Sequence, residues 1–159
     1  MGGTTMNREL LQSLLNQVVK VDRGGPESRV GKVLSAQSDY FALLTDEDGV
    51  VFYKLQHVKS ITQDSKNEMK IKAEVPKDFK KFESFLDFRA VLNELRHKWI
   101  KINRGGPESV EGVLEEVFDD YITIVLNNEV IRVAMFHIRN VSYGKKPEKK
   151  SEKQNGEES

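Results

Sequence analysis

The 159-residue sequence contains no cysteine, which excludes disulfide bonds, thiolate metal sites and a cysteine nucleophile. Absence of cysteine also fits synthesis in a reducing cytosol. No apolar run approaches the ~20 residues that a membrane-spanning helix needs. The first ten residues, MGGTTMNREL, lack the basic and apolar regions of a signal peptide, and Met6 stands where a myristoylation motif has Ser or Thr. We therefore expect a protein that is made inside the cell and does not enter a membrane.

An excess of charge of either sign is also missing. The chain has 25 Lys and Arg residues against 25 Asp and Glu residues, so its formal net charge is zero. No overall field therefore attracts nucleic acid or an anionic membrane surface. On this ground we expect neither as a partner.

The sequence does contain an internal repeat. The hexapeptide RGGPES occurs twice, as Arg23, Gly24, Gly25, Pro26, Glu27 and Ser28, and again as Arg104, Gly105, Gly106, Pro107, Glu108 and Ser109. The same offset aligns Gly31 with Gly112, and Asp39-Tyr40 with Asp120-Tyr121. After a one-residue gap within the segment 45–49, the alignment resumes and matches His57 with His137. The chain thus holds two copies of one unit, and the gap falls where a hairpin loop tolerates a change of length.

Each unit is predicted to begin with an amphipathic helix, over residues 7–17 in the first unit and 85–98 in the second. In the first helix, spacings of three and four place one set of apolar residues on a single stripe: Leu10, Leu11, Leu14, Leu15 and Val18. Short runs rich in Val, Ile, Tyr and Phe follow, separated by Gly, Pro, Asp or Asn. These runs predict five strands per unit, at 18–22, 30–38, 40–45, 50–55 and 58–61, and at 99–103, 111–118, 121–126, 130–135 and 138–143.

One helix followed by five short strands is typical of a small SH3-like or Sm-like barrel. The predicted fold class is therefore mainly β with short helices, as two tandem five-stranded barrels. Gly31 and Gly112 favour this interpretation, because a small barrel must bend its second strand sharply and bring backbones close together.

This interpretation divides the chain into four parts. Residues 1–61 form the first repeat and residues 79–144 the second. Residues 62–78 are a polar linker, with a short strand expected at 69–75. Residues 145–159 are a charged tail without apolar residues, which we expect to be disordered.

Two hypotheses account for the repeated hexapeptide, which lies between the first and second predicted strands. As a turn, it uses its glycines for positive φ and its proline for a fixed φ. As a ligand loop, it would use Arg23 or Arg104 beside the paired glycines to hold a phosphate or carboxylate. Because Glu27 and Glu108 lie in the same loops, they can pair with these arginines internally, which favours the turn.

The other recurring residues also favour structural roles. His57 and His137 each lack a second His or a Cys at ligand spacing, so we interpret them as turn residues before the last strand. Asp39-Tyr40 and Asp120-Tyr121 recur without a nucleophile or second carboxylate, which indicates a turn Asp followed by a strand Tyr. No P-loop, GxGxxG or GxSxG motif occurs. We therefore predict no catalytic residue, no metal site and no cofactor.

The Sm-like interpretation makes RNA binding an alternative function, because Sm proteins bind RNA through their third and fifth loops. Asp46-Glu47-Asp48 in the first unit would repel phosphate, whereas Asn127-Asn128 in the second is less hostile. At the fifth-loop position stand His-Val-Lys and His-Ile-Arg, without the Arg-Gly of Sm proteins. RNA is therefore the less favoured partner.

The two units, each with RGGPES, then Gly, then Asp-Tyr, then H-[VI]-[KR]-x-[IV], resemble the N-terminal region of the spore coat protein B family of endospore-forming bacilli. The similarity covers about residues 18–143 and includes the segment HKWIKINRGGPE. It implies a non-enzymatic structural protein, made in the mother-cell cytoplasm during sporulation and deposited in the spore coat. Other coat proteins are the implied partners. Because strand edges of small barrels can pair with neighbours through main-chain hydrogen bonds, we also expect self-association.

Overall fold

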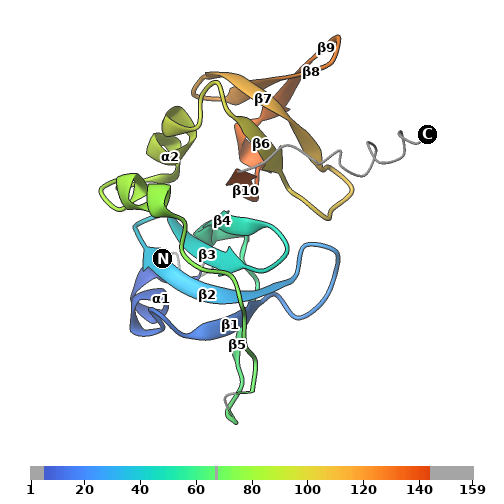
Figure 1. Ribbon diagram of the computed structural model, residues 1–159. Coiled ribbons are helices and arrows are strands. Elements are labelled where there is room, and N and C mark those ends of the chain that lie inside the picture. Colours follow the sequence, from blue (N-terminus) through green and yellow to red (C-terminus); the bar gives the residue numbers. More distant parts are fainter. Residues whose placement is uncertain (1–5, 67, 144–159) are drawn as a thin grey trace, which may run out of the picture.

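The computed structural model describes residues 6–66 and 68–143 (Figure 1). The fold is mainly β with few short helices, as predicted. None of the helices within these two described segments is long and apolar enough to cross a membrane. The tail at 145–159, predicted to be disordered, lies outside the described residues.

The elements follow the same order in both halves of the chain. The first half contains helix α1 (Arg8–Ser13), strands β1 (Val18–Val21), β2 (Arg29–Ala36), β3 (Tyr40–Thr45) and β4 (Gly49–Lys54), the 3-10 turn η1 (Leu55–His57) and strand β5 (Ile61–Gln63). The second half contains the 3-10 helix η2 (Lys77–Phe82), helix α2 (Phe88–Glu94), strands β6 (Trp99–Ile102), β7 (Val110–Val117), β8 (Tyr121–Leu126) and β9 (Glu129–Ala134), the turn η3 (Met135–His137) and strand β10 (Asn140–Tyr143).

The strands form one open antiparallel sheet of ten, in the order β5-β1-β2-β3-β4-β10-β6-β7-β8-β9. Within each half the last strand lies beside the first. Even the register is repeated: Val21 lies opposite Ile61 in the first half, and their counterparts Ile102 and Val141 are opposite each other in the second. That each half is an Sm-like barrel stays a prediction, since the strands belong to one open sheet.

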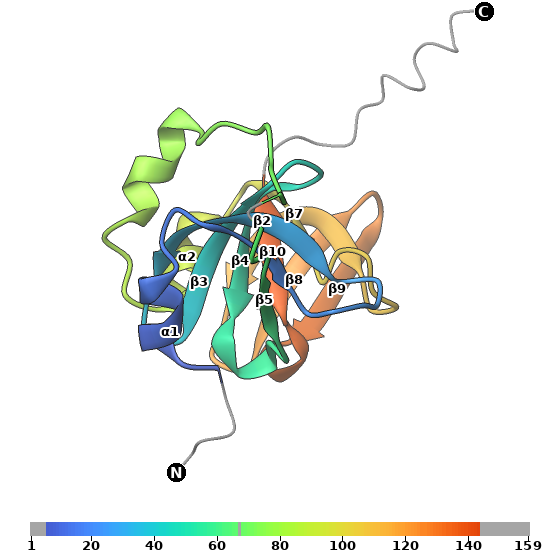
Figure 2. The ribbon, with the colours of Figure 1, turned by 90° about the horizontal axis from the view of Figure 1, so that it is seen from below.

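The two halves are joined where β4 pairs with β10, in the middle of the sheet (Figure 1). Phe52 lies opposite Val141, and the Lys54 N–H donates to the Arg139 carbonyl at 3.0 Å. Helices α1 and α2 lie on the same side of the molecule, away from β8 and β9 (Figure 2). The junction therefore makes one continuous sheet out of two repeats.

Both predicted helices are shorter in the structure than in the prediction. Helix α1 starts at the N-cap Asn7, whose carboxamide oxygen accepts from the Leu10 N–H at 2.9 Å. It ends before Asn16, which takes a left-handed φ of 69° and donates its N–H to the Val33 carbonyl. His97 does the same after α2, with a φ of 71°. These left-handed residues turn the chain into the first strand of each half and end the helices early.

Shortening α1 also changes its apolar stripe. Leu11 and Leu14 are buried, whereas Leu10 is 42% exposed and Leu15 is 41% exposed. The prediction of a five-residue apolar stripe is therefore wrong for Leu10 and Leu15, which face solvent. This short helix and its C-cap residue Leu14 bury only two leucines.

The structure corrects two further predictions in and before the linker. The fifth strand of the first half starts at Ile61 rather than at residue 58, because η1 follows β4. The predicted strand at 69–75 is not formed by the residues described there. Instead, the Asp46 carboxylate accepts from the N–H groups of Lys72 and Ala73, at 2.8 and 2.7 Å, and ties the linker to the β3–β4 turn.

Buried side chains form two clusters, and only one belongs to a single half. The first cluster, which includes Leu11, Phe41 and Tyr53, is made of first-half residues. In the second cluster, Tyr40 and Phe52 from the first half pack with the buried residues of the second half. The β3 and β4 strands thus use both faces: one for their own half and one for the partner half.

Gly31 and Gly112 lie where backbones approach closely, as the sequence predicts. A Cβ on Gly31 would lie 2.6 Å from the Leu44 carbonyl oxygen, and one on Gly112 would lie 2.6 Å from that of Val125. No real Cβ tolerates such contacts, so the second strand of each half needs a glycine here.

Replacing Gly31 by alanine is expected to destabilise the fold by about 1–3 kcal/mol, because the new methyl group meets backbone that cannot yield. Urea denaturation followed by circular dichroism measures the change. Gly24→Ala is the matched control, since a Cβ there meets nothing within 4 Å. Equal losses in the two variants would contradict the close-approach explanation.

Candidate functional site

The two copies of the hexapeptide lie against each other at the junction of the halves. The first follows β1 and the second follows β6. A Cβ on Gly105 would overlap the Pro26 carbonyl oxygen, and a Cβ on Gly106 would overlap the Glu27 carboxylate. Gly105 is therefore required, because its neighbour is backbone, whereas a side chain at 106 would displace the Glu27 carboxylate from its present position.

Identical sequences adopt different backbone conformations in the two loops. In the first copy the second glycine, Gly25, has a positive φ of 91°. In the second copy the first glycine, Gly105, has a positive φ of 94°. A pair of glycines permits either solution, and the environment at the junction selects between them.

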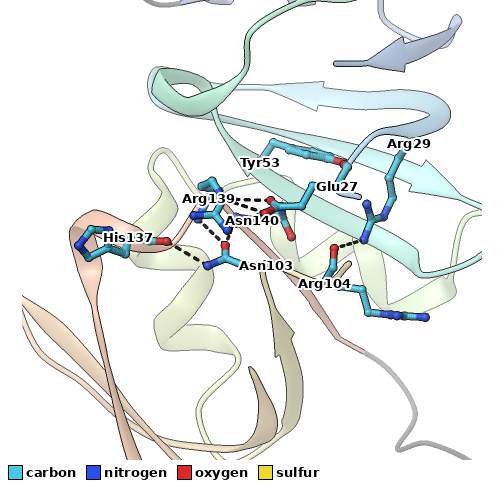
Figure 3. A network of polar contacts seen from close by, with 8 residues as sticks. All are labelled: Glu27, Arg29, Tyr53, Asn103, Arg104, His137, Arg139 and Asn140. Carbon is cyan, nitrogen blue, oxygen red and sulfur yellow. Dashed lines mark hydrogen bonds and ion pairs between the residues drawn. The ribbon is translucent and has the colours of Figure 1, made fainter. Parts of the chain in front are cut away.

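An ion pair joins the first hexapeptide to the second half (Figure 3). The Glu27 carboxylate accepts from Arg139 Nη2 at 2.6 Å and Nε at 3.0 Å, and from Asn140 Nδ2 at 3.1 Å. The Glu27 and Arg139 side chains are 17% and 29% exposed. Hydrogen bonding to Glu27 raises the pKa of Arg139. This fork-to-carboxylate geometry is among the stronger polar interactions available to side chains.

Buried Asn103 positions the arginine of this pair. Its carboxamide oxygen accepts from the Arg139 N–H at 2.7 Å, and its Nδ2 donates to the His137 carbonyl at 3.0 Å (Figure 3). In the first half, Asp22 holds Lys59 in the same way, through an N–H to carboxylate bond of 2.8 Å. The sequence analysis missed this contact between an Asx side chain and a backbone N–H because one copy has Asp and the other Asn. Its only signal was an Asx residue immediately before each RGGPES.

A second ion cluster surrounds Asp48, whose side chain is 3% exposed. Its carboxylate accepts from Arg29 Nε at 2.6 Å and from Arg104 Nε at 2.8 Å. Arg29 also donates to the Arg104 carbonyl at 2.6 Å (Figure 3). The pairing within each loop that the sequence allowed for Glu27 and Arg104 does not form, because both side chains reach across the junction to the other half.

The side chains of Asp39 and Tyr40 also form hydrogen bonds with the second half. The Asp39 carboxylate accepts from the Phe88 N–H at 2.9 Å, and the Tyr40 hydroxyl donates to the Phe85 carbonyl at 2.8 Å. Burial raises the pKa of Asp39, and raises that of Tyr40 to about 12. The repeated pair Asp120-Tyr121 stays within its own half, where the Asp120 carbonyl accepts from the Met135 N–H and the Tyr121 ring lies 4.9 Å from that of Phe118.

Both repeated histidines lie in 3-10 turns. The His57 ring in η1 lies 6.2 Å from the Phe136 ring, while His137 in η3 is exposed. Burial, and then the nearby Lys54 cation, lowers the pKa of His57. Across residues 6–66 and 68–143, no group of three or more His, Cys, Asp or Glu side chains could hold a metal ion.

A cleft of about 330 Å³ lies at the contact of the two hexapeptide loops and is lined by residues of both. Glu27, His57, Pro107 and Arg139 are among the residues that line it. Because Glu27 and Arg139 already pair with each other, the central charges of this cleft are satisfied within the protein. The site is therefore best described as a polar contact between the repeats.

No protein-family model matches the chain. The chain is similar to Spore coat protein B of Bacillus subtilis (strain 168), with 42% identity over 148 residues. The aligned region covers 93% of this chain and 38% of that relative, so the chain spans less than two fifths of the relative's length. This similarity shows a relationship to the spore coat protein B family and confirms the resemblance seen in the repeats.

Replacing Glu27 by glutamine is expected to lower the free energy of unfolding by about 1–3 kcal/mol, because Arg139 loses a charge-assisted partner in a partly buried position. Urea denaturation measures the loss. The matched control is Glu108→Gln, which changes the equivalent but exposed residue of the second hexapeptide. Similar effects in both variants would show that the ion pair does not stabilise the junction.

Stability should also depend on the titration of His57. Since its pKa in the folded protein lies below the ordinary value of 6.5, the unfolded chain takes up the proton first as the pH falls. The free energy of unfolding should therefore become smaller as the pH falls from about 7.5 to about 5.5. In the His57→Gln variant this loss of stability should be smaller. Denaturation curves across this range test the effect; identical pH slopes for the two proteins would refute it.

Proposed function

We propose that this relative of spore coat protein B is a non-catalytic structural component of the bacterial endospore coat that acts through protein–protein contacts. The observation that carries the proposal is the 42% identity over 93% of the chain. On this proposal the protein is made in the mother-cell cytoplasm and deposited in the coat. Its partners are other coat proteins and further copies of itself.

The arrangement of the polar residues supports a structural role. Glu27 and Asp48 join the two repeats, and Asn103 fixes the backbone before β10 that carries Arg139. Asp39 ties β3 to the start of α2. Polar side chains that form intramolecular hydrogen bonds and ion pairs of this kind are typical of a rigid structural module.

The repeats themselves are proposed to be Sm-like units, comprising residues 1–61 and 79–144 around the linker at 62–78. The repeated order of strands and the repeated register support this description. RNA binding gains no support from the turn after β3. There Asp46 holds the linker backbone and Asp48 sits between two arginines, so the loop is committed to the fold.

The proposal can be tested with a fluorescent fusion of the full chain, produced in sporulating Bacillus subtilis. We expect the fluorescence to gather on the forespore surface and to remain with the coat fraction after spore release. The fluorescent protein alone is the control. A fusion that stays evenly distributed in the mother cell, while the untagged chain is also absent from coat extracts, would overturn the proposal.

A further inference from the structure

The internal junction uses one free edge from each repeat and leaves one free edge on each. Strand β4 of the first repeat pairs with β10 of the second. The counterpart of β4 in the second repeat is β9, and the counterpart of β10 in the first repeat is β5. In the part of the chain that the structure describes, β9 pairs only with β8, and β5 pairs only with β1. The two edges lie at opposite ends of the molecule (Figure 1). Each molecule therefore has two exposed strand edges, on β9 and β5, that are equivalent to the two edges paired in its own β4–β10 junction.

We propose that the β9 edge of one copy pairs with the β5 edge of the next copy, so that molecules join head to tail by repeating the β4–β10 junction. The inference rests on the proposed assembly function and specifies a second copy of this chain as a partner. Unpaired edge strands are known templates for strand addition between chains. A contact between two different surfaces of this kind closes into a ring or continues as a filament.

The internal junction fixes the register expected between molecules. Inside the molecule, Tyr53, Phe52 and Val51 lie opposite Asn140, Val141 and Ser142. The sequence repeat carries this pairing to β9 and β5 without adjustment, since β8–β9 repeats the register of β3–β4 and β6–β10 repeats that of β1–β5. The expected pairs are Val133 with Ser60, Arg132 with Ile61, and Ile131 with Thr62.

Charge complementarity is kept at the position of the central ion pair. The counterpart of Glu27 is Glu108, and the counterpart of Arg139 is Lys59. Both counterparts are exposed, and the Lys59 backbone is held by Asp22 as the Arg139 backbone is held by Asn103. Lys59 and Glu108 line the same cleft in one molecule, but within the described chain no ion pair joins them. An acidic residue of one copy can thus meet a basic residue of the next.

Other features make the contact between molecules weaker than the one inside. Phe52 packs with Phe79, Phe82 and Tyr143, whereas its counterpart on β9 is the exposed Arg132. A charge on an edge strand discourages indiscriminate pairing. Apolar surface is nevertheless present at this edge, since Val130 is 54% exposed. The internal junction is therefore permanent, while the external one is reversible and depends on protein concentration.

Sedimentation velocity of the purified full chain, over a dilution series, tests the inference. The wild type should form larger species as concentration rises, and less so at high salt because the pair is exposed. Glu108→Lys or Lys59→Glu alone should raise the concentration for half-maximal association about five- to tenfold, because each places like charges opposite each other. The charge-matched control is Glu116→Lys on β7, away from both edges, which should associate as the wild type does.

The decisive arm mixes the two single variants. One then carries lysine at both positions and the other carries glutamate at both, so an equimolar mixture should associate in alternating order. The double variant should associate as well, and melting curves by circular dichroism confirm that every variant is folded. Association of either single variant at the wild-type level, or no recovery in the mixture, would overturn the inference. A wild type that stays monomeric throughout the series would also overturn it. Recruitment of the fluorescent fusion to spores would then still support the proposed coat function, which separates the two failures.

Discussion

Pairing of β4 with β10 is the constraint on which the rest of the structure depends. Backbone groups of a strand edge that is buried inside the fold must be hydrogen-bonded, and at this junction each repeat supplies the partner strand for the other. Once these two strands are side by side, the hexapeptide loops meet, Glu27 reaches Arg139, and Phe52 enters the core of the second half. The polar contacts and the shared core are thus consequences of one strand pairing as well as supports for it.

The duplicated unit has kept its topology while its surfaces have diverged. At the internal junction the first repeat contributes Arg29, Phe52 and Lys54. Their counterparts in the second repeat are Val110, Arg132 and Ala134. The first-repeat residues that face the other repeat are aromatic or charged. Of their counterparts, Arg132 and Ala134 are exposed on the edge strand β9, whereas Val110 packs against the core of the second half. The identical hexapeptides belong to the same pattern: Glu27 is part of the junction, while Glu108 is exposed.

Alternation of apolar residues was enough to predict the class of the fold and most of the strands, because this pattern reports which face of a sheet a side chain occupies. The close approach at Gly31 was predictable from a glycine inside a strand. It carries no information about which backbone edge pairs with which, so the β4–β10 junction was not predictable. The early helix ends depend on left-handed Asn16 and His97, residue types that adopt helical angles equally well elsewhere. The ion pair between Glu27 and Arg139 joins residues 112 positions apart, and the nearer arginine of the same loop was the natural but incorrect choice.

One buried cluster uses residues of the first half alone and the other uses both halves, which has a consequence for synthesis on the ribosome. The cluster around Leu11 and Phe41 contains only residues that emerge early, so the first half can complete that core as soon as it leaves the exit tunnel. Tyr40 and Phe52, by contrast, point toward a core whose other members are still untranslated. A nascent chain therefore displays an apolar face for the time needed to make the second half, and that interval is when a chaperone, or a premature encounter with another nascent chain, would act on it.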